Sequence, residues 1–267
     1  MGRMMAHFEL ATAANGVAYL TCPALGAPHG FSTRLGGQSE GPFASLNLGV
    51  SAGDDEPTVR LNRQAWAEAL GMPGPILSLH QVHGAAVHAV AERPHETLYG
   101  DGVVSATPGL PISVFTADCT PILLHDPVSG AVGAVHAGWR GTVAHVVQAA
   151  VQAMAERYGA RPEAMRAAIG PAIGPCCFEV GPEVVEAASQ APWPGWEAAV
   201  VPQSPRPHFD LFEANERQLV AAGLAPERVF NSRLCTACRA DWFYSWRRDQ
   251  GRTGRLQAAI MRPGGPA

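Results

Sequence analysis

Two histidines and one cysteine, far apart along the chain, are the residues of this sequence best suited to chemistry. His83 lies in LHQVHG, Cys119 in TADCTP and His136 in AVHAG. Each is expected at or beside the end of a buried strand, where a scaffold presents rigid side chains to a cleft. Two imidazoles and one thiolate form a catalytic zinc set that leaves the fourth position open. Zinc would lower the pKa of water bound there to about 7.

The residues alone leave two other interpretations open, because their long spacings match no local zinc motif. Without metal, Cys119 would be a nucleophile, with His136 or His83 as its base and Asp118 nearby. An adjacent imidazolium would lower the pKa of this thiol. Alternatively, each histidine caps its strand and Cys119 packs as a small buried hydrophobe. A fourth ligand, for which His80 is the obvious candidate, would close the site and favour a structural metal.

Two arginines are candidates for binding an anion. The turn Gly138–Thr142 leads into a predicted helix, so its backbone N–H groups and the helix dipole favour negative charge. Arg140 adds a planar donor fork that suits phosphate. Arg34 stands before two glycines and would serve similarly if it lines a cleft. The alternative is an ordinary strand–turn–helix connection with a solvated Arg140.

The other cysteines carry weaker signals. Cys235 and Cys238 form a C-x-x-C, but the redox interpretation needs a following helix that the pattern does not show. A four-cysteine zinc site with Cys176 and Cys177 is disfavoured, because adjacent cysteines rarely chelate as a C-x-x-C does. The aromatic and arginine run at 243–249 is typical of a strand with a charged turn, although one of its aromatics could stack on a purine.

Hydrophobic periodicity predicts the elements that position these residues. The clearest is a helix over 143–158 with Thr142 as N-cap and Gly159 as its end. Further helices are expected at 181–189 and at 210–222, the latter capped by Asp210. Strands are expected at 76–90 (a pair or a bulged strand), 112–116 resuming at 122–124, 131–136, 166–170, 228–234 and 255–261. The connections between these elements include both hairpin-length and helix-length segments, which predicts a sheet with both parallel and antiparallel strands.

Composition excludes several classes of protein. Of the 267 residues 47% are apolar and 16% are charged, which allows a large core and excludes a disordered chain. The net charge of −4 shows no basic footprint for nucleic acid. We find neither a signal peptide nor an apolar run near the roughly 18 residues of a membrane span, so we expect a soluble cytoplasmic protein with free cysteines.

Taken together, the motifs resemble a known family. They are QVHG (81–84), TADC (116–119), HAGWRGT (136–142), CCFEV (176–180) and FYSWRRD (243–249). In this order they resemble the YfiH-like family, over about residues 28–261. Its members have been described as multicopper polyphenol oxidoreductases (laccases) and as purine nucleoside phosphorylases with adenosine deaminase activity.

The resemblance implies a fold and an activity. The fold is α+β, a sandwich with mixed β-sheets inside and helices packed outside, in one catalytic domain over 1–267. The activity is phosphorolysis of adenosine, inosine and methylthioadenosine to free base and ribose 1-phosphate, with hydrolytic deamination of adenosine to inosine. The partners are purine nucleosides and phosphate, with no nucleic acid or membrane, in a monomer or small homo-oligomer. Alternatives are a copper-dependent phenol oxidase and a cysteine-type hydrolase that edits peptidoglycan precursors.

The resemblance also implies residue roles. Zn²⁺ would bind His83, Cys119 and His136, and Cu²⁺ could replace it in vitro. Asp118 would move protons during deamination. Charge and placement suggest that Arg34 and Arg140 hold phosphate against C1′ of the ribose.

Overall fold

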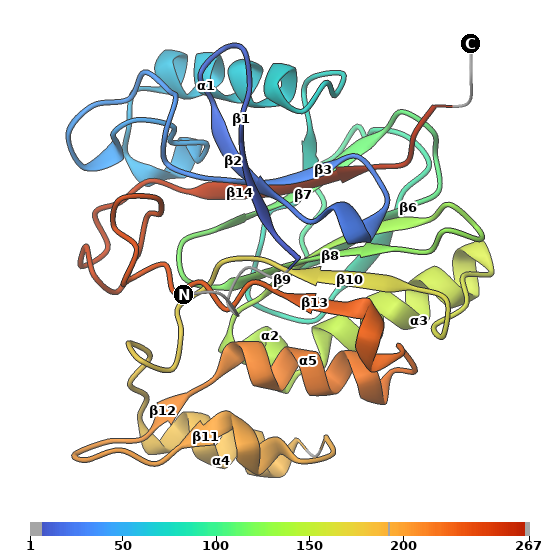
Figure 1. Cartoon of the computed structure of the whole chain (residues 1–267), viewed down its shortest axis with the longest axis vertical. Coiled ribbons are helices and arrows are strands. Elements are labelled where there is room, and N and C mark those ends of the chain that lie inside the picture. Colours follow the sequence, from blue (N-terminus) through green and yellow to red (C-terminus); the bar gives the residue numbers. More distant parts are fainter. Residues whose placement is uncertain (1–6, 192, 265–267) are drawn as a thin grey trace.

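Two six-stranded mixed β-sheets pack face to face in the computed structural model, which describes residues 7–191 and 193–264 (Figure 1). The first sheet has the order β1 (Glu9–Thr12), β2 (Ala18–Thr21), β3 (His29–Ser32), β14 (Leu256–Met261), β7 (Pro111–Thr116) and β4 (Leu77–Ser78). The second has the order β13 (Val229–Asn231), β10 (Arg166–Ile169), β8 (Thr120–His125), β9 (Val132–Ala137), β6 (Gly102–Ser105) and β5 (Val87–Ala89). Three pairs are parallel, namely β4 with β7, β5 with β6 and β10 with β13, which confirms the predicted mixed sheet.

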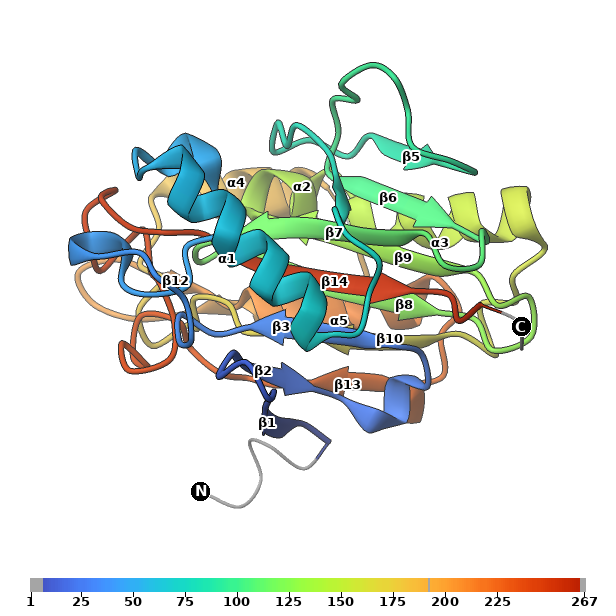
Figure 2. The same cartoon turned by 90° about the horizontal axis from the view of Figure 1, so that it is seen from above.

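Helices cover both outer faces of this sandwich. On the first sheet lies α1 (Glu56–Ala69), and on the second lie α3 (Val146–Tyr158) and α5 (Leu211–Ala221) (Figure 2). The remaining elements are α2 (Trp139–Val143), α4 (Pro182–Gln190), the strand pair β11 (Val200–Val201) and β12 (His208–Phe209), and 3₁₀ turns at Pro23–Leu25, Gly41–Phe43, Val50–Ala52, Trp196–Ala199 and Pro226–Arg228. The structure thus confirms the α+β sandwich with helices outside.

The strands of the second sheet are buried on both faces. In β8, Leu123 points into the core between the sheets, whereas Ile122 and Leu124 pack under the helices. A strand covered on both sides reads as a continuous apolar run instead of an alternating one. This explains why β8 and β9 were recognisable from the sequence as short apolar runs.

Two of the predicted helix caps are correct and one is wrong. Asp210 accepts hydrogen bonds from the N–H groups of Phe212 and Glu213 at the start of α5, and Gly159 ends α3 in the left-handed conformation. Thr142, however, lies inside α2, and α3 begins only after His145, whose φ is 62°. The apolar face continues through this break, so periodicity alone extended the helix too far.

Two predictions about strands are also wrong, namely the pair or bulged strand at 76–90 and the interrupted strand at 112–124. The segment 76–90 contains β4 and β5, which belong to different sheets, and so do β7 and β8 on either side of the turn 117–119. Both connections therefore cross between the sheets. Helix α1 and strands β1, β2, β3 and β6 were not identified from the sequence. In the part of the chain that the structure describes, each helix is too short or too polar to cross a membrane.

Candidate active site

The fold brings His83, Cys119 and His136 together at one edge of the second sheet. One potential ligand atom from each lies within 4.8 Å of the others. His83 comes from the connection between β4 and β5, Cys119 from the turn before β8, and His136 from β9. His136 is 3% exposed, Cys119 is half-buried and His83 is exposed, so the cluster is open on the His83 side.

Asp101, which the sequence did not single out, organises this cluster. Its Oδ1 lies 2.8 Å from His136 Nδ1, and its side chain is fully buried. The Asp101 carboxylate also accepts the backbone N–H groups of Val82, His83 and Gly84. With Nδ1 turned to Asp101, His136 has Nε2 free to face Cys119. The acidic partner of the histidine is therefore Asp101, where the nucleophile interpretation had placed Asp118.

The same carboxylate explains an unusual backbone at His83. Its φ is 59°, in the left-handed region that is uncommon for residues other than glycine. Three consecutive N–H groups bonded to the buried charge of Asp101 hold this conformation in place. One residue thus fixes both histidines.

Charge separation between Cys119 and His136 follows from these contacts. Burial by itself raises the pKa of the Cys119 thiol, but the charges and hydrogen bonds of His136 and His83 outweigh it and lower the pKa to about 6. Burial lowers the pKa of His136, whereas Cys119 and Asp101 outweigh burial and raise that pKa to about 9. Near neutral pH the site therefore presents a thiolate, the form that is both metal ligand and nucleophile.

Asp118 is held by segments from the far end of the chain. Its Oδ1 accepts the Thr236 hydroxyl at 2.6 Å, and its Oδ2 accepts the Arg247 N–H at 2.7 Å. The N–H of Ile173 donates to the Asp118 carbonyl at 2.8 Å. Because both carboxylate oxygens are engaged and the residue is buried, this geometry favours positioning of the adjacent Cys119 over proton transfer.

The predicted arginines differ in their surroundings. Arg140 is exposed on the short helix α2, with its guanidinium 4.2 Å from the Trp139 ring centroid. Arg34 donates to the carbonyls of Ala44 and Ala240 and so joins two loops. Arg255, to which the sequence gave no role, is half-buried. Burial lowers its pKa, and the negative charges of Cys119 and Asp118 offset part of this lowering. The Arg255 guanidinium donates to the Thr253 and Gly254 carbonyls and lies 4.9 Å from the Trp246 ring centroid.

Glycine is required next to the cysteine. A Cβ built on Gly138 would lie 2.9 Å from Cys119 Sγ and 3.3 Å from His83 Cδ2. At Gly84, which follows His83, a Cβ would meet nothing closer than 3.7 Å. The backbone at 138 therefore forms one wall of the site.

A cavity of about 300 Å³ lies next to the cluster. Its lining includes Trp139, Phe178, Glu179, Arg206 and Arg247. None of the three cluster residues lines this cavity, but two lining residues connect it to the cluster: Trp139 follows Gly138 directly, and the Arg247 N–H binds Asp118. This volume is at the lower end of the range for small-molecule sites.

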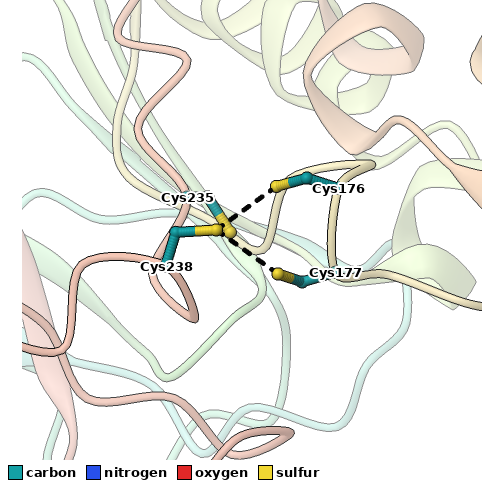
Figure 3. A group of neighbouring side chains, drawn as sticks. All are labelled: Cys176, Cys177, Cys235 and Cys238. Atoms are coloured by element: carbon teal, nitrogen blue, oxygen red, sulfur yellow. Dashed lines mark hydrogen bonds between the residues drawn. The ribbon is translucent and has the colours of Figure 1, made fainter.

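Two of the sequence expectations about ligands turn out differently. The His80 ring packs on Tyr99, with 4.8 Å between the ring centroids. It is not part of the three-residue group, so within the described residues it supplies no fourth ligand. Conversely, the disfavoured set of Cys176, Cys177, Cys235 and Cys238 does come together, with all four Sγ atoms within 4.8 Å of one another (Figure 3).

Comparison with known proteins identifies the family. Residues 28–263 match a family model described as multi-copper polyphenol oxidoreductase laccase. The chain belongs to this family. Several relatives carry the name YfiH, so we refer to the YfiH family. Solved structures of similar proteins carry this name or the name YlmD. YlmD from Geobacillus stearothermophilus has a TM-score of 0.88 at 38% identity and covers 95% of this chain and 98% of its own.

Other members of the YfiH family carry informative names. The chain is 43% identical over 252 residues to a protein of Deinococcus radiodurans named purine nucleoside phosphorylase, covering 94% of this chain and 95% of that protein. It is 37% identical over 229 residues to purine nucleoside phosphorylase YfiH of Escherichia coli, covering 86% and 91%. Bacillus licheniformis YfiH has a TM-score of 0.86 at 33% identity, covering 91% and 96%.

Proposed function

We propose that this chain is a zinc-dependent purine nucleoside phosphorylase that also deaminates adenosine. Its substrates would be adenosine, inosine and methylthioadenosine, split by phosphate into free base and ribose 1-phosphate (the 5-methylthio derivative from methylthioadenosine), and adenosine would also be hydrolysed to inosine and ammonia. The observation that carries the proposal is the convergence of His83, Cys119 and His136 in a chain whose relatives are named purine nucleoside phosphorylases.

The donor set fits the proposed metal. Two imidazoles and a thiol of lowered pKa match a three-ligand zinc site, and Asp101 fixes the orientation of His136 as an outer partner. A bound zinc ion would supply Lewis acidity and an activated water. Cu²⁺ binds such donors more tightly than Zn²⁺, which would account for the oxidoreductase description of the family.

The substrate would lie across the cavity and the cluster. Trp139 and Phe178 offer aromatic faces in the cavity lining on which a purine could stack. We assign phosphate binding to Arg140, whose guanidinium lies over the Trp139 ring, and to Arg255, whose charge interacts with those of Cys119 and Asp118. Arg34 would act indirectly, by holding the two loops that it joins.

Paired histidine variants test this assignment. His83→Ala removes a proposed ligand, whereas His80→Ala removes an exposed histidine three residues away that lies outside the group. We expect His83→Ala to lose the zinc ion bound by the His83–Cys119–His136 cluster. Its turnover should fall at least about 100-fold, since misplacing reacting groups by about 1 Å costs this much. His80→Ala should keep both.

The products distinguish the two reactions. Chromatography of adenosine incubated with the protein should show adenine only when phosphate is present and inosine without it. If the wild-type protein yields neither product with zinc bound, the purine proposal is wrong. Equal losses in His80→Ala and His83→Ala would overturn the ligand assignment.

A second candidate is a metal-free cysteine hydrolase, and one observation favours it. Cys119, His136 and Asp101 form a thiol–imidazole–carboxylate series in the order of a nucleophilic triad. A strong chelator separates the candidates. Loss of the zinc held by His83, Cys119 and His136, with the other cysteines left undisturbed, should abolish the phosphorylase, whereas a hydrolase would keep its activity and be inactivated by iodoacetamide at Cys119.

A further inference from the structure

Four cysteines, none of which takes part in the proposed chemistry, form a second cluster. Cys176 and Cys177 lie between β10 and α4, and Cys235 and Cys238 follow β13. Cys238 Sγ is 3.5 Å from Cys176 Sγ and 3.4 Å from Cys177 Sγ, and all four sulfurs lie within 4.8 Å. Figure 3 shows the side chains of the two segments pointing toward one another.

The spacing of the sulfurs matches tetrahedral coordination. Zn–S bonds of about 2.3 Å at tetrahedral angles place sulfurs about 3.8 Å apart, whereas a disulfide needs about 2.05 Å. All four cysteines are free thiols in the structure. Four thiolates in tetrahedral array select zinc or iron.

The surroundings of the cluster suit bound thiolates. The Gly174 N–H donates to Cys235 Sγ at 3.2 Å, a bond of the kind that orients metal ligands. A Cβ on Gly174 would lie 3.2 Å from Cys235 Cβ and 3.3 Å from Cys176 Sγ, so glycine permits this close approach. The Arg248 guanidinium, which is paired with Asp249, donates to the carbonyls of Thr236 and Ala237 and so holds the turn between Cys235 and Cys238.

We propose that Cys176, Cys177, Cys235 and Cys238 bind one Zn²⁺ as a tetrathiolate site, distinct from the His83–Cys119–His136 cluster. A closed set of four thiolates leaves no position for substrate, so the site is structural. The adjacent pair Cys176–Cys177 supplies two ligands from one tight turn, and the C-x-x-C supplies the other two.

The tetrathiolate site braces the segments that hold Asp118. Ala172 and Cys235 form a parallel bridge, and the Thr236 N–H donates to the Ala172 carbonyl at 2.9 Å. From these same two segments, the Ile173 N–H and the Thr236 hydroxyl bind Asp118, the residue before Cys119. A metal that ties the segments together would therefore position Cys119 from a distance.

Metal counting tests the site independently of any reaction. Elemental mass spectrometry of the wild-type protein, purified under reducing conditions with zinc present, should find two zinc ions per chain. Cys238→Ser should lose the tetrathiolate zinc, and Cys119→Ala should lose only the other. The double variant should bind none. His80→Ala is the control and should keep both.

Cobalt substitution reports on the same site through its sulfur ligands, without changing any of the four cysteines. Co²⁺ in the tetrathiolate site should give intense sulfur-to-metal charge-transfer absorption that persists in Cys119→Ala. The proposal is overturned if Cys119→Ala binds no metal, if the four cysteines are recovered as disulfides from the freshly purified wild type, or if iron occupies the site. Because the count needs no substrate, its failure is separate from failure of the phosphorylase proposal.

Discussion

At the scale of single residues, the site depends on one buried carboxylate. Asp101 binds His136 Nδ1 and three consecutive N–H groups around His83, so both histidines are fixed by the same charge. His83, Cys119 and His136 could be chosen from the sequence because of their chemistry and their expected strand-end positions. Asp101 could not, since a lone aspartate outside any predicted strand looks like any other.

Replacing Gly138 by alanine should damage the site while sparing the fold. The backbone at 138 is extended, with φ −72° and ψ 172°, so alanine fits the main chain. Its Cβ would lie 2.9 Å from Cys119 Sγ, and rotation of that thiol away from the histidines would relieve the contact. We expect a loss of about 100-fold in turnover with a change in unfolding free energy below about 1 kcal/mol.

Gly84→Ala is the matched control for this prediction. Its Cβ meets nothing closer than 3.7 Å, so turnover and zinc content should stay near wild type. Urea unfolding, zinc content and steady-state turnover should be measured on both variants. Full activity in Gly138→Ala would show that Cys119 does not need its observed orientation.

At the scale of elements, the site is assembled by segments from opposite ends of the chain. The turn 117–119 connects the two sheets. Hydrogen bonds from residues that follow β10 and β13 hold it at Asp118. Thr236 is the side chain that makes this contact, at 2.6 Å to Asp118 Oδ1. Positioning of Cys119 therefore depends on the packing of distant segments.

Thr236→Val should weaken both stability and turnover. The change preserves shape but leaves buried Asp118 Oδ1 without this donor, which should cost about 1–3 kcal/mol of unfolding free energy. Turnover should fall because the turn that carries Cys119 loosens. Thermal unfolding and steady-state kinetics measure the two effects.

Thr120→Val is the control, because it makes the same chemical change at a fully buried threonine. Thr120 Oγ1 has no hydrogen-bond partner among the described residues. Removing this hydroxyl should leave stability unchanged within about 0.5 kcal/mol or raise it. If Thr120→Val destabilises as much as Thr236→Val, the loss reflects packing and not the bond to Asp118.

At the scale of the whole molecule, two buried histidines should make the fold sensitive to acid. Burial is the largest cause that lowers the pKa of His29 and of His125 below the ordinary value. His29 Nε2 accepts the Cys22 N–H at 2.8 Å, so protonation there would break a buried hydrogen bond. Because the folded-state pKa values lie below the unfolded value of about 6.5, the neutral forms stabilise the fold above that pH, and this contribution is lost as the pH falls.

The measurement is a difference between proteins, so that other titrating groups cancel. Unfolding free energy should be determined from pH 7.5 down to 5 for wild type and for the double variant His29→Gln, His125→Gln. Each histidine should add up to about 1.4 kcal/mol per pH unit to the decline of the wild type below pH 6.5. Parallel curves for the two proteins would show that neither histidine is responsible.

The sequence by itself determined the features that depend on near neighbours along the chain. Residue types marked His83, Cys119 and His136, apolar runs marked the central strands, and the caps at Asp210 and Gly159 followed from local hydrogen bonding and backbone conformation. The motif order also indicated the family, which the comparisons confirmed.

Only the tertiary structure decided what is joined across the chain. It placed β4 and β5 in different sheets, added Asp101 and Arg255 to the site, and gathered four cysteines that local spacing had argued against. The physical reason is that periodicity and capping report on the few residues around each position. Sheet membership and side-chain convergence depend instead on the packing of segments that lie far apart along the chain, such as those that carry Asp101 and His136, 35 residues apart, or Cys176 and Cys238, 62 residues apart.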